Sequence, residues 1–236
     1  NTSNIIYQSL PIQPAPPAAT YVNLPANLIN SGFEVGIGAT VIEKTNLSWD
    51  VNFNISYNKN KLTKFTDPLT GRDIKIITGQ INGQGVSGTL GQIITNNQTV
   101  DAYYLKPFGG FDANGNQIID ANGTGPAIAG NPNPTTIYGF STTLKYKKVS
   151  LVINAGGAAG YKIYNNTATS VTNRSGISNG RNIDKKAYES AEKPSSGVGA
   201  SDRFLEKGNY FKLRNVSVNY NVGNVFRYVK SLNGFV

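Results

Sequence analysis

The chain has 236 residues, a formal net charge of +9 at pH 7, and no cysteine, histidine or methionine. Without cysteine it forms no disulfide, and without histidine as well it lacks the usual zinc sites and the Ser-His and Cys-His nucleophile pairs. The composition therefore excludes most hydrolytic and redox enzymes. The basic residues are spread over connecting segments rather than gathered on a helix, which favours solvated loops over nucleic-acid binding.

The composition also indicates an all-β protein. Its 26 glycines and 11 prolines, together with many asparagines, oppose helices and favour strands joined by turns. No run of about 18 apolar residues is present, so no membrane-spanning helix is expected. The mean hydropathy of -0.29 does not exclude a membrane barrel, because half of each barrel strand is polar.

Alternation of apolar and polar residues, bounded by turn-forming residues, predicts six strands. These strands span residues 32–42, 47–59, 137–146, 149–164, 209–222 and 229–236. Long connections separate them in pairs, over 60–136 and 165–208, and a further loop covers 9–31. A compact soluble domain rarely contains structureless connections of that length. An outer-membrane barrel does, because its extracellular loops are long and its periplasmic turns are short.

Tight turns are predicted within each pair of strands. They cover Glu43 to Asn46, Lys147-Lys148 and Gly223 to Tyr228. We expect all three on one side of a sequential, up-and-down antiparallel sheet, in which strand 47–59 lies next to strand 137–146.

The strand over 47–59 has two faces of different chemistry. Its odd positions are large and apolar as far as Tyr57, while its even positions are Ser, Asp or Asn. Trp49 and Tyr57 are about 26 Å apart along an extended strand, and tilting leaves roughly 20 Å between two aromatic girdles. The pattern predicts a wall with lipid on one face and a watery lumen on the other. The lipid-facing residues are then Leu47, Trp49, Val51, Phe53, Ile55 and Tyr57.

The strand over 209–222 changes phase along its length. Phe211 and Leu213 are at odd positions, whereas Val216 and Val218 are at even ones. A β-bulge near Arg214-Asn215 would keep all of these apolar residues on one face.

The segment 201–216 reads Ser-Asp-Arg-Phe-Leu-Glu-Lys-Gly-Asn-Tyr-Phe-Lys-Leu-Arg-Asn-Val and resembles the late-barrel signature of SusC/RagA-type TonB-dependent transporters. Three earlier segments resemble that family in the same order: the strand starts at 30–35 and 49–61, and the loop-to-strand entry at 130–140. The resemblance covers most of the chain.

The resemblance implies an antiparallel, up-and-down transmembrane β-barrel segment with long extracellular loops, part of a barrel of about 22 strands. It further implies the outer membrane of a Gram-negative, Bacteroidetes-like cell, contact with outer-membrane lipid, and no enzyme activity. The intact protein would import oligosaccharides or peptides with a SusD-like lipoprotein, and the TonB complex would act on it through a plug. The plug and the last strands are not matched, so residues 1–236 are expected to be a partial barrel domain from a longer precursor.

One short segment resembles the start of a calcium-binding loop, because hard oxygen ligands at alternate positions can surround a cation. Its candidate ligands are Asp112, Asn114, Asn116 and Asp120. Gln117 stands where the loop motif has its sharp-turn glycine, and Gly123 stands where it has a bidentate glutamate. An ordinary turn rich in Asn and Asp is therefore the favoured alternative, and no other cofactor is expected.

The longest predicted loop carries four aromatic residues that are candidates for contact with the substrate or the partner: Tyr103, Tyr104, Phe108 and Phe111. Such residues can stack on sugars, anchor a partner protein, or pack the loop against itself, and the sequence leaves these alternatives open. Because a barrel wall needs only alternation and turns, we expect the loop over 60–136 to be a functional surface.

Two other functions remain open. A structural or secretion-associated barrel would use a similar scaffold without a TonB-contact segment. The other is a β-sandwich adhesin or lectin, which would be distinguished by its solubility without detergent.

Overall fold

The computed structural model describes residues 2–9, 20–68, 70–82, 86–193, 199–223 and 232–235. The predicted turn after Gly223 and the first part of the predicted last strand lie outside these residues. The chain divides into two units. The strand unit comprises Gly32–Asn58, Pro134–Gly160 and Gly208–Val236, and the loop unit comprises Asn1–Ser31, Lys59–Asn133 and Tyr161–Lys207. Within the described ranges, no helix is long and apolar enough to cross a membrane.

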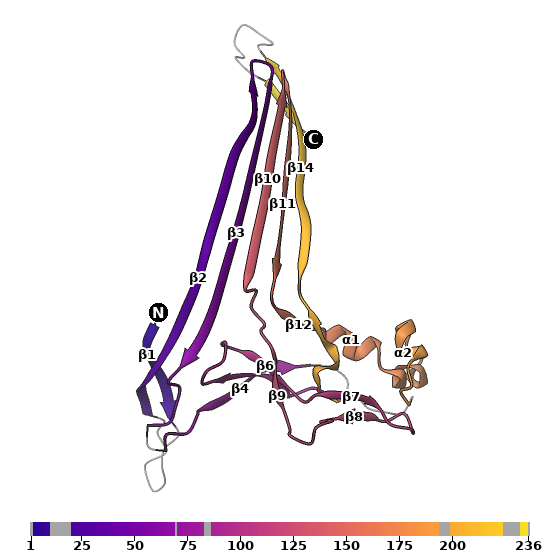
Figure 1. The fold of residues 1–236 in the computed structure, drawn as a ribbon. Helices are drawn as coiled ribbons and strands as arrows, with labels where there is room; N and C mark the ends of the chain where they lie inside the picture. The colour runs from indigo at the N-terminus through magenta and orange to yellow at the C-terminus, as the bar shows by residue number, and fades with distance from the viewer. Residues whose placement is uncertain are drawn as a thin grey trace. The chain divides into compact units, whose positions relative to one another are not determined.

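The main sheet has seven strands that follow one another in chain order (Figure 1). They are β1 (Thr2–Ser9), β2 (Thr20–Lys44), β3 (Leu47–Thr63), β10 (Thr136–Tyr146), β11 (Val149–Ala159), β14 (Tyr210–Gly223) and β15 (Leu232–Phe235). Antiparallel pairing joins β3 to β10, β10 to β11, and β11 to β14. The predicted up-and-down order and the pairing of β3 with β10 are thus confirmed.

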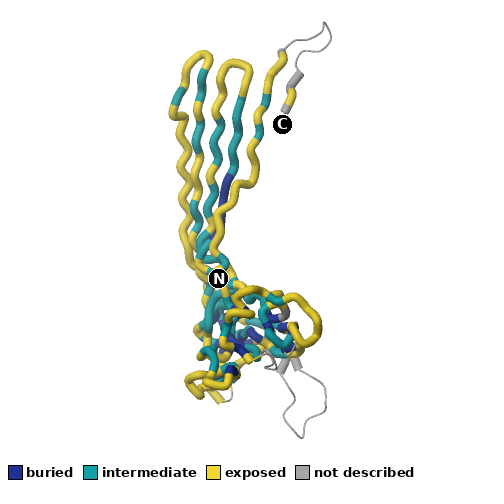
Figure 2. The backbone as a smooth tube through the Cα atoms, turned by 90° about the vertical axis from the view of Figure 1, so that its right-hand side faces the viewer, coloured by how far each residue is buried: buried dark blue, intermediate teal, exposed yellow. Residues whose placement is uncertain are grey.

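The register places apolar residues side by side on one face of the strand unit. Trp49 is paired with Leu144, and Leu144 with Leu151, which in turn is paired with Val218. The neighbouring row on the other face contains Asp50, Thr143, Val152 and Ser217. Within the described part of the strand unit this apolar face remains accessible, since Phe211 keeps 65% of its surface exposed. Figure 2 accordingly shows the long strands as mostly exposed or intermediate.

A β-bulge keeps this apolar face continuous, as predicted. Asn154 is paired with Asn215, but the next residue, Ala155, is paired with Leu213, so Arg214 is the extra residue. Beyond the bulge, Phe211 shares the apolar face with Tyr138, and the two rings stack with centroids 6.1 Å apart.

Side-chain hydrogen bonds also join β3 and β10. The indole Nε1–H of Trp49 donates to Thr142 Oγ1 over 2.8 Å, and the Thr142 hydroxyl donates to the Asp50 carbonyl over 3.0 Å. The only tryptophan of the chain therefore reaches a strand that is 93 residues away in the sequence.

The predicted loop over 9–31 is wrong for residues 20–31, which form the first half of β2. This half pairs with β1, for example Tyr7 with Val22. Its buried residues are Leu24 and Ala26, on either side of a proline. Apolar residues alternate with Asn and Pro over 22–28, but Pro25 in the middle argues against a strand, and pairing with β1 stabilises the strand despite this proline.

The prediction of a structureless connection over 60–136 is also wrong. It contains the end of β3 and a four-stranded sheet of β4 (Lys75–Ile81), β5 (Thr89–Thr95), β6 (Ala102–Leu105) and β9 (Ala127–Gly130). A second small sheet pairs β7 (Phe108–Phe111) with β8 (Gln117–Ile119). Two buried apolar clusters support the loop unit, one around Leu24 and Phe65 and the other around Leu105 and Phe204.

The predicted strand over 149–164 is interrupted at Gly160. This glycine has a left-handed backbone with φ of 79°, and a Cβ there would collide with Thr135 Oγ1. The chain leaves the main sheet at this point, and β12 (Lys162–Tyr164) pairs with β13 (Leu205–Lys207) in a separate sheet.

The predicted loop over 165–208 contains short helices. They are α1 (Asn166–Val171), α2 (Lys185–Glu189) and two 3₁₀-helices, η1 (Arg174–Asn179) and η2 (Asp202–Phe204). The first three each begin after an Asn or Asp whose side chain accepts a backbone N–H, namely Asn165, Asn173 and Asp184. Helices of six residues or fewer show no usable apolar period, which is why the sequence did not indicate them.

The two faces of β3 should tolerate charge very differently. Phe53→Lys places an ammonium group on the expected lipid face and should lower the free energy of unfolding in a bilayer by about 2–4 kcal/mol. Asn52→Lys, its neighbour on the polar face, is the matched control and should cost much less. Reversible unfolding of the full-length protein in vesicles measures both. Equal costs for the two variants would contradict the assignment of the faces.

Candidate functional site

The candidate site lies in the loop unit, where β6 separates two pockets. Successive side chains of a strand point to opposite faces, so Tyr103 lines one pocket and Tyr104 lines the other. Both tyrosines are half-buried. The structure thus brings two of the four predicted aromatic residues to neighbouring but distinct cavities.

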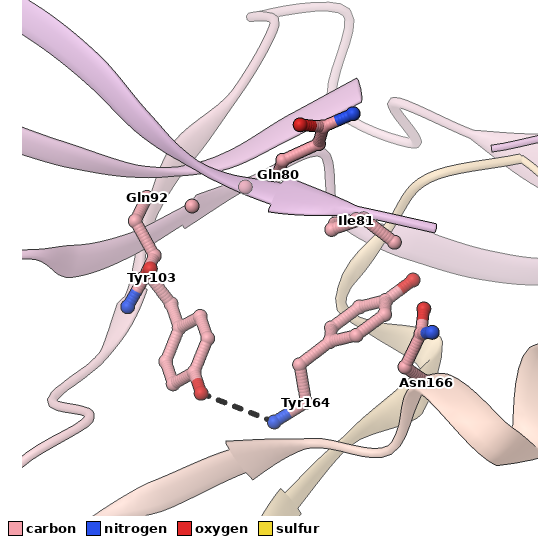
Figure 3. A pocket seen from close by; sticks show the side chains of 8 residues that line it. Gln80, Ile81, Gln92, Tyr103, Tyr164 and Asn166 are labelled. Atoms are coloured by element: carbon pink, nitrogen blue, oxygen red, sulfur yellow. Dashed lines mark hydrogen bonds between the residues drawn. The ribbon is translucent and has the colours of Figure 1, made fainter. Parts of the chain in front are cut away.

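The Tyr103 pocket has a volume of about 170 Å³ and no charged residue in its lining. The Tyr103 hydroxyl accepts a hydrogen bond of 3.1 Å from the backbone N–H of Tyr164. Figure 3 shows the two rings on opposite sides of the pocket, with the amide side chains of Gln80, Gln92 and Asn166 around them. The pocket therefore offers aromatic faces and neutral amides, which suit an uncharged polar group.

Tyr164 is held in its neutral form. Burial raises the pKa of its hydroxyl above the ordinary value of 10.0. Its oxygen is buried and has no hydrogen-bond partner among the residues that the structure describes. The phenol therefore remains a potential donor at physiological pH.

The Tyr104 pocket is larger and more apolar. Its volume is about 320 Å³, and its lining includes Leu90, Leu105, Ile119 and Pro126, with Lys106 as its charged residue. A pocket of this kind fits an apolar side chain presented by another molecule.

Phe108 and Phe111 occupy a third environment. Their rings meet edge to face with centroids 5.5 Å apart. The Arg203 guanidinium lies 5.3 Å from the centroid of Phe108 and 5.1 Å from that of Phe111. These two residues pack the loop unit against itself, so the four predicted aromatic residues do not form one cluster.

Sequence reasoning missed the ion pair beneath these rings. Arg203 donates to Glu192 Oε2 over 2.9 Å, and the side chains are 12% and 0% exposed, respectively. The other carboxylate oxygen accepts a 2.9 Å hydrogen bond from Gln117 Nε2, and Arg174 Nη1 donates to the Glu192 carbonyl over 2.8 Å. The ion pair therefore joins η2 to the segment that follows α2, and the hydrogen bond from Gln117 joins β8 to the same segment.

Asp202, the neighbour of Arg203, joins the segment 201–204 to β7. Its Oδ1 accepts a 2.8 Å hydrogen bond from the Phe108 backbone N–H, and its own N–H donates to the Lys106 carbonyl. The segment 201–204 was visible as a motif, but its partners are too distant in the sequence to be deduced from it.

The candidate calcium ligands form the turn between β7 and β8 and the segment after it. Asp112 Oδ1 accepts 2.8 Å hydrogen bonds from the backbone N–H groups of Asn114 and Asn116, and Oδ2 accepts one from Asn116 Nδ2. The Asp120 carboxylate is bound to the Gly125 N–H instead. Among the described residues, no three acidic side chains group around one point. These bonds favour the Asn- and Asp-rich turn, and calcium binding stays a prediction.

No family model matches the chain. It is 23% identical over 218 residues to the TonB-dependent receptor SusC of Bacteroides thetaiotaomicron, a match that covers 85% of this chain and 21% of SusC. It is 25% identical over 229 residues to the TonB-dependent receptor P3 of Formosa agariphila, with 84% and 22% covered. The chain thus spans about a fifth of the length of these curated relatives.

Solved structures agree on the fold. The RagAB peptide importer in its open-open state matches 99% of this chain and 27% of the importer chain, with a TM-score of 0.77 and 14% identity. Its closed-closed state gives a TM-score of 0.74 with 16% identity over 99% of this chain and 28% of the importer chain. The chain is a homologue of part of a SusC/RagA-type TonB-dependent receptor.

This homology confirms the family that the sequence indicated. The SusC/RagA-type segment belongs to the outer membrane, and its relatives are receptors and transporters rather than enzymes. Its fold is all-β and antiparallel, although the strands of this segment alone do not close a barrel.

Removing the buried carboxylate should loosen the loop unit. Glu192→Gln leaves Arg203 without its counter-charge and should destabilise this region by about 3–5 kcal/mol. The control is Glu189→Gln, because Glu189 forms an exposed ion pair with Lys185 and should contribute less than about 1 kcal/mol. Hydrogen exchange over β7 and β8 in the full-length protein measures both. Equal protection of the β7 and β8 amides in the two variants would show that Glu192 does not hold these strands in place.

Acid should open the turn between β7 and β8. The hydrogen bond from the Asn116 side chain lowers the pKa of Asp112 below its ordinary value of 3.8, with further bonds from backbone N–H groups. The ionised carboxylate therefore stabilises the turn fully above the ordinary pKa, and this contribution is lost as the pH falls through the lowered pKa. Hydrogen exchange at Asn114 and Asn116 between pH 5 and 2 should show the loss. Asp112→Asn should abolish this pH dependence, and an unchanged profile would refute the assignment.

Proposed function

We propose that this chain supplies barrel wall and extracellular loops to a TonB-dependent importer of oligosaccharides or peptides, which works with a SusD-like surface lipoprotein. The observation that carries the proposal is a continuous two-faced sheet, with an uncovered apolar face, whose fold matches a transporter barrel over nearly the whole chain. In this arrangement the apolar face meets outer-membrane lipid and the polar face meets the lumen.

The loop unit is the proposed contact surface. Tyr104 and its apolar pocket would receive a side chain of the lipoprotein, because apolar pockets lined by an aromatic residue are typical anchor points of protein interfaces. The Tyr103 pocket, with its amides, would contact uncharged polar parts of the substrate. Phe108 and Phe111 would act indirectly, by holding this unit in shape around Arg203.

The alternatives fit less well. A soluble adhesin or lectin would have to cover the apolar face of the strand unit, where Phe33, Ile37 and Phe211 are more than half exposed. A structural or secretion-associated barrel would have the same wall, but it would not need two separate pockets in the loop unit.

The test is Tyr104→Ala in the full-length transporter. We expect co-purification of the lipoprotein to fall by about tenfold or more, because removing an anchor residue typically costs at least 1.4 kcal/mol. Uptake of the cognate nutrient should fall with it. Tyr188→Ala is the matched control, since Tyr188 is 65% exposed in the same unit and lines neither pocket. Unchanged association and uptake in a folded Tyr104→Ala protein would refute this contact.

A further inference from the structure

The turn between β10 and β11 is hydrogen-bonded to the neighbouring turn on one side and to β14 on the other. Lys147 and Lys148 form this turn (Figure 1). The Lys147 N–H donates to the carbonyl of Asn46 in the turn between β2 and β3, and the Asn221 N–H of β14 donates to the Lys148 carbonyl, both over 2.8 Å. The backbone here is therefore fixed from both sides.

A basic pocket of about 210 Å³ opens at this turn. Lys145, Lys147 and Lys148 line it, and they are joined by Val149, Ser150, Asn219 and Asn221. None of the described residues that line it carries a carboxylate. The ion pairs of the described residues involve Glu189 and Glu192, both in the loop unit, so neither neutralises these lysines.

The neutral contacts of these lysines do not replace a counter-charge. The Lys148 ammonium donates to the Val222 carbonyl over 3.4 Å, and the Lys147 ammonium lies 5.4 Å from the centroid of the Tyr146 ring. The neighbouring turn carries Glu43 next to Lys44, so their formal charges cancel. Three like charges around one cavity attract an anion.

The backbone of Lys147 gives a second, independent indication. Its φ of 51° lies in the left-handed region, which is unfavourable for a residue with a side chain and costs glycine nothing. Tight hairpins normally have glycine or asparagine at such a position. A lysine kept in a strained conformation suggests that its side chain has a role other than forming the turn.

The pocket also lies at the level expected for a membrane surface. Tyr146, Val149 and Tyr220 form one row on the apolar face, immediately before the turn. Both tyrosines are about half exposed, as aromatic residues of an interfacial girdle are. Lys147 and Lys148 lie directly beyond this row, where lipid phosphates are found, whereas Lys145, Ser150 and Asn219 form the adjacent row on the polar face.

We propose that Lys145, Lys147 and Lys148 bind a phosphate group, carried either by an anionic phospholipid or by a soluble phosphate. The ammonium groups supply the charge, and the Ser150 hydroxyl and Asn219 amide supply neutral hydrogen bonds to phosphate oxygens. This site lies in the strand unit and does not depend on the proposed transport function.

The experiment uses the full-length transporter purified in a non-ionic detergent. Native mass spectrometry compares retention of dioleoylphosphatidylglycerol with that of dioleoylphosphatidylcholine, and thermal unfolding with added inorganic phosphate at constant ionic strength tests the soluble source. The variants are Lys147→Gly and the double variant Lys145→Gln/Lys148→Gln. The control is Lys185→Gln/Lys186→Gln, which removes two charges from α2 in the loop unit.

We expect binding to weaken about fivefold for each lysine removed from the pocket and to be unchanged in the control. Lys147→Gly should at the same time keep or raise the melting temperature, because glycine relieves the backbone strain, and this separates binding from folding. If the pocket variants lose only the binding of phosphatidylglycerol, the site takes a lipid headgroup. If they lose only the stabilisation by inorganic phosphate, the site takes soluble phosphate. Equal binding by the native protein and the pocket variants, or an equal loss in the control, overturns the proposal.

Discussion

Register is the constraint on which the strand unit depends. Each strand has one apolar and one polar face, and a slip of a single residue would exchange them along the whole strand. Without the extra residue at Arg214, Phe211 and Leu213 would point to the polar face, while Lys212 would point into the apolar one. A chain with lipid on one side cannot accommodate that exchange, so the bulge is a requirement of the wall rather than an irregularity in it.

The loop unit is stabilised by a different kind of interaction. Its strands are short, and an ion pair with a fully buried carboxylate joins the segments that its two apolar clusters leave apart. Arg203 is surrounded by the rings of Phe108, Phe111 and Phe204, which limit its access to water. A buried pair of this kind adds little net stability compared with an apolar core, but losing one partner is costly. It therefore fixes one arrangement of the segments around the two pockets.

The sequence predicted the wall well because the wall obeys a local rule. Alternation, turn residues and the phase change near Arg214 are all visible within a few residues, and they correctly gave the strand order and the bulge. The loop unit could not be predicted in this way, because its structure depends on distant partners such as Gln117 with Glu192 and Phe108 with Asp202. The aromatic residues of β6 and β7 were recognised, but only the structure shows that Tyr103 and Tyr104 point to opposite faces and that Phe108 and Phe111 pack around Arg203.

The hydrogen bond from Trp49 to Thr142 gives the chain a built-in spectroscopic reporter. Because no other tryptophan is present, all indole fluorescence comes from one point on β3, at the edge of the apolar face. Its emission maximum depends on the polarity around the ring and on whether its N–H is bonded to a hydroxyl. A folding experiment could therefore use this natural chromophore to follow the pairing of β3 with β10, which brings together the two ends of the connection over residues 64–135.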